Sequence, residues 1–220
     1  MTKLRIITLL LCGQFGVWLN EARADELPEI LQKVLTSDTA YQSISCRIIV
    51  ELDVPGLSMP EKEIGLRLEK GKKPTIESEG ITILPRHGII GQYRDFLDLE
   101  CQVIPVGENG DTLVYKVVSL ERRSDWTTVD LVVTGSDAKI HSMLVSTRKN
   151  GEYLIRHWYG AGPEPFPERT EISFEAMPLK LPLKFMGRQE GIEFLTEERG
   201  PVTGRVILRY SDIFWTLSSE

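Results

Sequence analysis

Three histidines are the side chains in this sequence best suited to acid–base chemistry or metal binding. His141 and His157 fall in neighbouring strand-like runs, and His87 lies in an irregular segment. A zinc site usually shows closely spaced ligands, such as HExxH or paired Cys-x-x-Cys, and neither pattern occurs. We therefore interpret the histidines as surface or interstrand residues, with His141 and His157 pointing to opposite faces of a sheet.

A short acidic segment is the second candidate for chemistry. Asp95, Asp98 and Glu100 are close enough in sequence to suggest a calcium site or a glycosidase carboxylate pair,. The segment lacks the loop glycine and alternating oxygen ligands of an EF-hand, and is more typical of a solvated acidic loop. No nucleophile elbow, phosphate-binding glycine loop or dinucleotide fingerprint occurs. We predict that the protein is not an enzyme and uses no metal or other cofactor. A hydrolase with dispersed carboxylates is the alternative.

Two cysteines, Cys46 and Cys101, lie beyond the first 24 residues. In an oxidising compartment they could form a disulfide, which would stabilise the fold by about 4 kcal/mol through loop closure. They could equally be two buried thiols that pack as small apolar side chains. The sequence leaves both interpretations open.

Residues 1–24 have the features of a secretory signal peptide. Lys3 and Arg5 precede an interrupted apolar run, and Ala22-Arg23-Ala24 resembles a cleavage site,. The run is shorter than the roughly 20 apolar residues of a membrane-spanning helix, so an anchor is the weaker alternative. We predict cleavage near Ala24, export to the periplasm, and a single domain over residues 25–220.

The charge of the chain limits its partners. The formal net charge is −6, and no Lys/Arg stripe offers the counterion release that drives binding to phosphates. We therefore expect no nucleic-acid partner.

The hydrophobic pattern predicts one helix followed by about ten strands. Residues 25–42 carry one apolar helical stripe. Alternating or extended runs then follow at 44–54, 63–69, 75–78, 81–84, 101–106, 112–120, 129–135, 140–148, 152–159, 168–176 and 205–211. A further alternating run at 179–185 contains prolines that keep it at an edge or off the sheet,. The connections are too short for helical crossovers, which indicates an antiparallel meander that must curl or close.

The joint at Asn150-Gly151 predicts the register of one hairpin. Asn-Gly favours a two-residue type I′ turn. That turn would pair Met143 with Trp158 and Val145 with Arg156, and would leave both faces of the hairpin of mixed polarity,.

Apolar side chains exceed what one sheet face needs. They are Leu57, Met59, Ile89, Ile90, Trp126, Met143, Trp158, Leu179, Leu181, Leu183, Phe185, Phe214 and Trp215. They could fill a core thickened by the helix, or some of them could line a cavity for an apolar ligand.

The order of parts resembles the outer-membrane lipoprotein carrier superfamily, which includes the localisation factors LolA and LolB. The resemblance spans nearly the whole chain after residue 24. It rests on a signal peptide, one helix, a long first strand and a second strand ending in Gly71-Lys72-Lys73-Pro74. A meander with the turn Asp137 to Ile140 and a closing strand Pro167 to Ile172 complete the match.

This resemblance implies an α+β fold in which a strongly curved antiparallel sheet, an incomplete β-barrel, is lidded by the N-terminal helix. An apolar cavity would hold acyl chains, and its candidate lining residues are Ile48, Val50, Leu66, Leu68, Met143, Val145 and Trp158. In the carriers, an arginine that directly precedes a proline holds the lid closed. Lys73 matches that position, but lysine lacks the planar fork of arginine.

The resulting hypothesis is a periplasmic, non-enzymatic carrier of lipid or lipoprotein acyl chains, with transient membrane contact. The alternative of another class is an envelope protein-binding or sensing module. It would contact an envelope protein partner through the apolar loops at 57–60 and 160–167.

Overall fold

The structure is a computed structural model that describes residues 27–55, 57–58, 60–70, 72, 75–77, 94–97, 100–161, 166–176, 193–194 and 202–217. The predicted signal peptide, the latch candidate Lys73, His87 and the runs at 81–84 and 179–185 lie outside the described residues.

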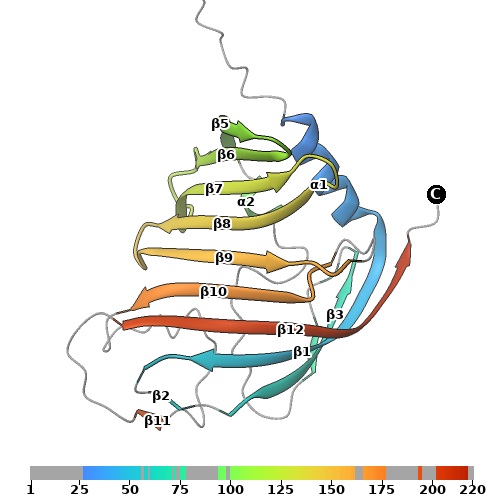
Figure 1. Cartoon of the computed structure of the whole chain (residues 1–220), viewed down its shortest axis with the longest axis vertical. Coiled ribbons are helices and arrows are strands. Elements are labelled where there is room, and N and C mark those ends of the chain that lie inside the picture. Colours follow the sequence, from blue (N-terminus) through green and yellow to red (C-terminus); the bar gives the residue numbers. More distant parts are fainter. Residues whose placement is uncertain are drawn as a thin grey trace, which may run out of the picture.

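Ten strands form one antiparallel sheet in the order β4-β3-β1-β12-β10-β9-β8-β7-β6-β5 (Figure 1). Their bounds are β1 Tyr41–Asp53, β3 Lys62–Glu69, β4 Thr75–Glu77, β5 Cys101–Asn109, β6 Thr112–Ser119, β7 Trp126–Thr134, β8 Lys139–Thr147, β9 Glu152–Trp158, β10 Arg169–Ala176 and β12 Val202–Leu217. Two short strands, β2 Leu57–Ser58 and β11 Glu193–Phe194, pair with each other. The sheet is not closed, since β4 and β5 are its two edges. The predicted α+β class and curved antiparallel meander are confirmed.

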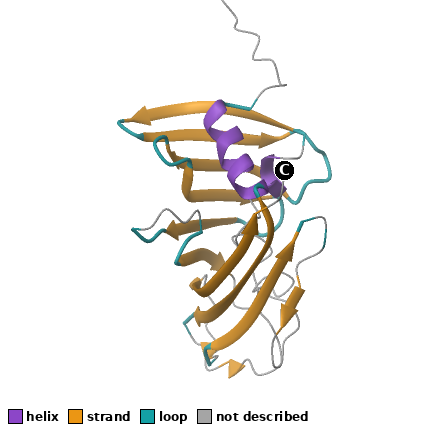
Figure 2. Cartoon of the chain, turned by 90° about the vertical axis from the view of Figure 1, so that its right-hand side faces the viewer, coloured by secondary structure: helices purple, strands orange, loops and turns teal. Residues whose placement is uncertain are grey.

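The first and last strands of the main sheet, β1 and β12, pair with each other. Strands β5 to β10 follow one another as neighbours, and β12 then inserts between β10 and β1. Figure 2 shows how strongly the sheet curves around the side that carries the helices. We call this side the inner face and the opposite side the outer face.

The alternation predicted for the first long strand is confirmed. Along β1, Ile44, Cys46 and Ile48 are buried, whereas the residues between them are half-buried or exposed. The strand begins at Tyr41, earlier than expected, because the preceding helix ends at Thr39 rather than at residue 42.

Strand β12 is longer than its predicted span of 205–211. Asp212 takes a left-handed conformation with φ 48°. At this point the pairing of β1 with β12 shifts by one residue, from Arg47↔Ser211 to Ser45↔Phe214. Such a bulge lets a strand continue with a changed twist. The segment Ile213-Phe214-Trp215 therefore belongs to the strand and is not a tail after it.

The predicted register of the β8–β9 hairpin is wrong. Met143 pairs with Ile155 and Val145 with Tyr153, and the loop between Thr147 and Glu152 spans residues 148–151. Gly151 has a positive φ of 73°, but Asn150 does not, so the type I′ turn does not form. The Thr147 hydroxyl closes the longer loop by donating to the Gly151 carbonyl at 2.8 Å and accepting from the Asn150 amide at 2.9 Å.

Two helices lie on the inner face. Helix α1, Glu29–Thr39, crosses the ends of β5 to β8 (Figures 1 and 2), with Leu31 and Val34 buried. Helix α2, Arg94–Leu97, is a single turn within the segment 85–100, where the sequence left open a short helix or a loop, and it buries Phe96 and Leu97. Neither described helix is long and apolar enough to cross a membrane.

Candidate functional site: the inner face of the sheet

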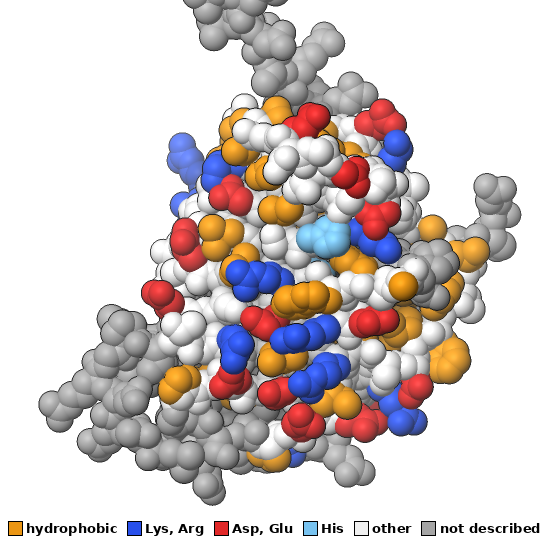
Figure 3. Space-filling view, in the orientation of Figure 1, with side chains coloured by type: hydrophobic (Ala, Val, Ile, Leu, Met, Phe, Trp, Pro, Cys, Tyr) orange, Lys and Arg blue, Asp and Glu red, His pale blue; other side chains and the backbone are white. Residues whose placement is uncertain are grey.

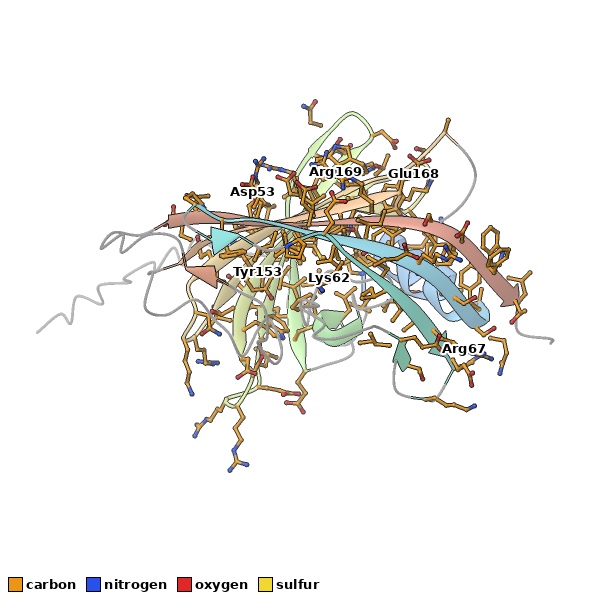
Figure 4. All side chains as sticks on the ribbon, turned by 90° about the horizontal axis from the view of Figure 1, so that it is seen from below. Asp53, Lys62, Arg67, Tyr153, Glu168 and Arg169 are labelled. Carbon is orange, nitrogen blue, oxygen red and sulfur yellow. The ribbon has the colours of Figure 1, made fainter. Side chains whose placement is uncertain are left out.

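The inner face is a continuous apolar surface built by alternate residues of neighbouring strands. Antiparallel partners share a face, so the register places the following buried residues side by side across seven strands. They are Ile64 and Leu66 of β3, Ile48 and Val50 of β1, Val206 and Leu208 of β12, Ile172 of β10, Ile155 of β9, Met143 and Val145 of β8, and Val129 and Leu131 of β7. Figure 4 shows Tyr153 on this side, with Asp53 and Arg169 on the other.

Most of the residues named from the sequence as candidate cavity lining lie on this face. Ile48, Val50, Leu66, Met143 and Val145 are buried there, and Leu68 is half-buried opposite Ile44 at the end of β3. The structure thus brings six of the seven candidates onto one surface.

Trp158 is the exception, and its predicted position on the same face as Met143 is wrong. The observed register differs from the predicted one by three residues, and an odd shift moves a side chain to the opposite face,. Trp158 lies on the outer face, 41% exposed, with the Arg169 guanidinium 4.7 Å from its ring centroid. Tyr153 and Ile155 take the inner positions instead. The sequence interpretation missed this because Asn-Gly favours a two-residue turn, whereas the Thr147 hydroxyl closes a longer loop,.

The helices cover the inner face with apolar side chains. Leu31 of α1 is fully buried, and Phe96 of α2 packs edge-on against Trp126 of β7 with ring centroids 5.4 Å apart. These residues belong to the same hydrophobic cluster as Ile48 and Met143. Within the described residues, α1 and α2 thus form an apolar cover over part of the inner face.

One polar cluster interrupts the apolar surface. His157 Nδ1 lies 2.9 Å from the Thr170 hydroxyl, and Tyr210 also hydrogen-bonds Thr170. Burial, with a smaller effect from His141, lowers the pKa of His157 to about 3. Burial raises the pKa of Tyr210, with the Thr170 hydrogen bond acting in the opposite direction. Both rings are therefore neutral at pH 7, and the inner face carries no charge at this cluster.

His141 differs from His157 in its environment, although the register from which the sequence predicted opposite faces is wrong. His141 is exposed and its ring meets Tyr159 edge-on at 5.5 Å, whereas His157 is buried. A buried histidine that is neutral at physiological pH is a hydrogen-bonding residue and not a strong general base.

Both cysteines are free thiols. Cys46 and Cys101 belong to β1 and β5, which are separated by six strands in the sheet order. Burial raises the pKa of Cys46 to about 11 and also raises the pKa of Cys101. At neutral pH both remain protonated and weakly nucleophilic.

The acidic segment is only partly described. Asp95 belongs to α2 but its side chain, like Asp98, is outside the described residues, and Glu100 is exposed. Within the part of the chain that the structure describes, no three His, Cys, Asp or Glu side chains come together as metal ligands would.

The outer face contrasts with the inner face because charged side chains cover it (Figure 3). Ion pairs link neighbouring strands: Arg205 bonds Asp53, and Arg209 bonds Glu51 at 2.5 Å. Within β10, Arg169 bonds Glu171 at 2.7 Å. The sheet thus separates a charged, solvated side from an apolar side, and only the apolar side suits a water-insoluble ligand.

Comparisons with protein-family models and with curated proteins give no match. Among solved structures, a DUF1329 family protein from Desulfovibrio piger aligns with a TM-score of 0.51 and 8% identity over 87% of this chain and 92% of its own. A LolA superfamily protein from Nitrosomonas europaea aligns with a TM-score of 0.48 and 12% identity over 86% and 94% of the two chains. A putative outer membrane lipoprotein-sorting protein domain from Vibrio parahaemolyticus gives 0.47 and 9% over 90% and 95%.

The chain shares its fold with the DUF1329 family protein. The curved, open antiparallel sheet with an N-terminal helix, expected from the order of its parts, is the architecture observed. At identities of 8–12% the similarity does not extend to particular site residues.

Proposed function

We propose that this protein is a periplasmic, non-enzymatic carrier that shelters acyl chains of lipids or lipoproteins against the inner face of its sheet. The observation that carries the proposal is the continuous apolar surface from Leu66 of β3 to Leu131 of β7, covered by α1 and α2. An acyl chain needs a long apolar surface without charges, and the polar cluster around His157 on this surface is neutral.

The energetics of this surface suit acyl binding. Each methylene removed from water contributes about 0.8 kcal/mol, so a long acyl chain supplies enough free energy to offset the displacement of a short helix. Helix α1 is the cover that would move, because it is only 11 residues long and lies at the ends of the strands. Release of the acyl chain would require α1 to move away from the sheet again.

The chemistry of the described side chains supports a carrier over a hydrolase. The two thiols are protonated, and His157 is neutral and hydrogen-bonded to Thr170. On the outer face, ion pairs with arginines engage the carboxylates of Glu51, Asp53 and Glu171. None of these groups is placed as an activated nucleophile beside a base.

No described feature favours the protein-binding alternative through its predicted loops. In the loop 160–167, Phe166 is buried and packs against Tyr41 at a centroid distance of 5.0 Å, so it is not an exposed contact residue. The side chains of residues 57–58 lie outside the described part of the chain.

A photoreactive fatty acid tests the proposal by locating the ligand. We expect crosslinks on inner-face residues such as Met143 and Leu68, and none on Trp158 of the outer face. Leu68→Gln should weaken binding by about tenfold, because a half-buried contact with the acyl chain becomes polar. Trp158→Ser is the matched control and should bind as the wild type does. Crosslinks confined to the outer face would exclude the proposal.

A further inference from the structure

Three strand ends form one corner of the sheet at the edge of the molecule. They are the end of β12, the start of β1 and the end of β3 (Figure 1). The pairs Ser43↔Thr216 and Ser43↔Glu69 place these ends side by side. We call this region, together with Lys70 and Lys72 after β3, the β12 corner.

The β12 corner exposes large apolar side chains. Phe214 is 69% exposed, Leu217 65% and Trp215 40%. Trp215 packs on one side against Tyr41 and Phe166, with centroid distances of 6.5 and 5.7 Å. Phe214, its neighbour along the strand, points to the opposite face beside Ser45. Apolar groups thus project from both faces of the strand.

This part of β12 extends beyond its neighbour β10. The pairing with β10 begins at Arg169↔Arg209, and the amide of Tyr210 still donates to the Glu168 carbonyl. From Ser211 onward the strand partner described for β12 is β1 alone. The end of β12 therefore extends past β10 and forms the outermost of three strands, β12, β1 and β3.

Cations lie next to the apolar residues. The end of β3 and the turn after it carry Arg67, Lys70 and Lys72, all exposed, against one acid, Glu69. The amide of Lys70 donates to the Gln42 carbonyl at 3.0 Å, which fixes this turn beside the start of β1. Figure 4 shows Arg67 at the same end of the sheet as the end of β12.

The charge balance of the corner is opposite to that of the chain. By formal charge, Arg67, Lys70 and Lys72 outnumber Glu69, which bonds both Arg67 and Lys72, whereas the whole protein has a net charge of −6. Asp212, near the end of β12, is paired with Arg47 at 3.3 Å, and Glu77 of β4 lies opposite Gly65, two residues before Arg67 on β3. Because two strand spacings separate β3 from β12, the cations lie about 10 Å from the apolar side chains.

We propose that the β12 corner docks on a membrane surface that contains anionic lipids. Trp, Tyr and Phe are the side chains that settle at the boundary between headgroups and acyl chains. Neighbouring Lys and Arg residues gain from the negative surface potential of anionic headgroups. The net charge of this acidic chain opposes such binding, and the corner supplies the local attraction that the whole chain lacks.

The corner fits a bilayer better than a strand-shaped partner. A peptide or a second copy that added to the free edge of β12 would cover that edge, but would leave Phe214 and Trp215 on opposite faces only partly covered. A fluid interface surrounds both faces. Penetration must be shallow, since the unpaired backbone groups of the edge need water or headgroups as partners.

Vesicle co-sedimentation tests this docking. The purified full chain is mixed with vesicles of phosphatidylcholine alone, or of phosphatidylcholine with phosphatidylglycerol. We expect stronger binding to the anionic vesicles. Phe214→Ser/Leu217→Ser should lower partitioning at least about tenfold, because two apolar side chains no longer enter the interface. Lys70→Gln/Lys72→Gln should lower binding to the anionic vesicles only, by about fivefold for each cation.

Matched variants separate the β12 corner from the rest of the chain as the source of membrane affinity. Every variant keeps residues 1–24, so any membrane affinity of that segment is common to all. Val106→Ser, at an equally exposed apolar site on edge strand β5, should bind as the wild type does. The docking goes beyond the proposed carrier function and is independent of it, since the Phe214 and Leu217 variants should still bind a fatty-acid probe in solution.

Two results would overturn the inference. The first is equal vesicle binding by the wild type and the Phe214→Ser/Leu217→Ser variant, or an equal loss with Val106→Ser. The second is a dimer in solution that the double variant dissociates without any change in vesicle binding, which would assign the corner to a second copy of the chain.

Discussion

Single residues on the inner face decide what the surface can hold. Sheet positions that face the helices carry Ile, Val, Leu and Met, and the polar exceptions, His157, Thr170 and Tyr210, form a hydrogen-bonded cluster. A buried polar group without a partner costs a few kcal/mol, whereas a bonded neutral group is tolerated. The cluster can therefore lie within an apolar surface without attracting water or charge.

The pH dependence of stability follows from His157. Its pKa in the folded protein is about 3, against an ordinary value of 6.5. As the pH falls below 6.5, His157 becomes protonated in the unfolded state but stays neutral in the folded state. The free energy of unfolding therefore decreases toward acid pH. Between pH 7 and pH 5 the free energy of unfolding should fall by about 2 kcal/mol from this group. His157→Gln, which can keep a hydrogen bond to Thr170, should remove that part of the dependence. Urea unfolding at the two pH values measures it, and identical slopes for both proteins would contradict the assignment.

At the scale of elements, strands with strict alternation were predictable and loops were not. The runs that became β1, β3 and β10 place every second side chain in the core, because burial of one face imposes a period of two,. The predicted β8–β9 register was wrong because Thr147, at the end of β8, closes a four-residue loop rather than a two-residue turn. The extension of β12 was not predicted because aspartate tolerates the left-handed conformation without requiring it, so Asp212 was no specific signal of a bulge,.

The β8–β9 loop offers a test that separates the two registers. Gly151→Ala should destabilise the protein by about 1 kcal/mol, because Gly151 has a positive φ and Asn150 does not,. Asn150→Ala should change stability by less than about 0.5 kcal/mol. A type I′ turn would need positive φ at both residues, so equal losses in thermal unfolding would favour the two-residue turn.

The cover formed by helix α1 can be tested at the same scale. Leu31 is fully buried, so Leu31→Ala should cost about 2–4 kcal/mol and loosen the cover over the inner face,. Lys33→Ala, on the exposed side and paired with Glu29 at 2.8 Å, should cost less than about 1 kcal/mol,. Denaturant unfolding gives both values. Increased binding of a hydrophobic dye to Leu31→Ala at its folded baseline would show that α1 shields apolar surface.

At the scale of the whole molecule, the order of the strands in the sheet could not be predicted from the sequence, even where the strands themselves could. The pairing of β1 with β12 joins residues more than 150 positions apart, for example Asp53 with Arg205, and no local signal reports it. The same limit applied to the site. The buried residues of each alternating strand could be predicted from the sequence. Which face of β9 lies beside them could not, because it depends on the conformation of the β8–β9 loop. The cysteines illustrate this too, since their separation in the sheet order became clear only from the topology.

One side of the curved sheet is charged and solvated, and the proposed carrier function requires that the other side bind acyl chains beneath a helical cover. Native mass spectrometry of the purified protein after exposure to a lipid extract tests this most directly. We predict a bound lipid whose mass adds to the chain in a one-to-one complex, reduced in Leu68→Gln and retained in Trp158→Ser. A protein that stays free of lipid under these conditions would contradict the central claim.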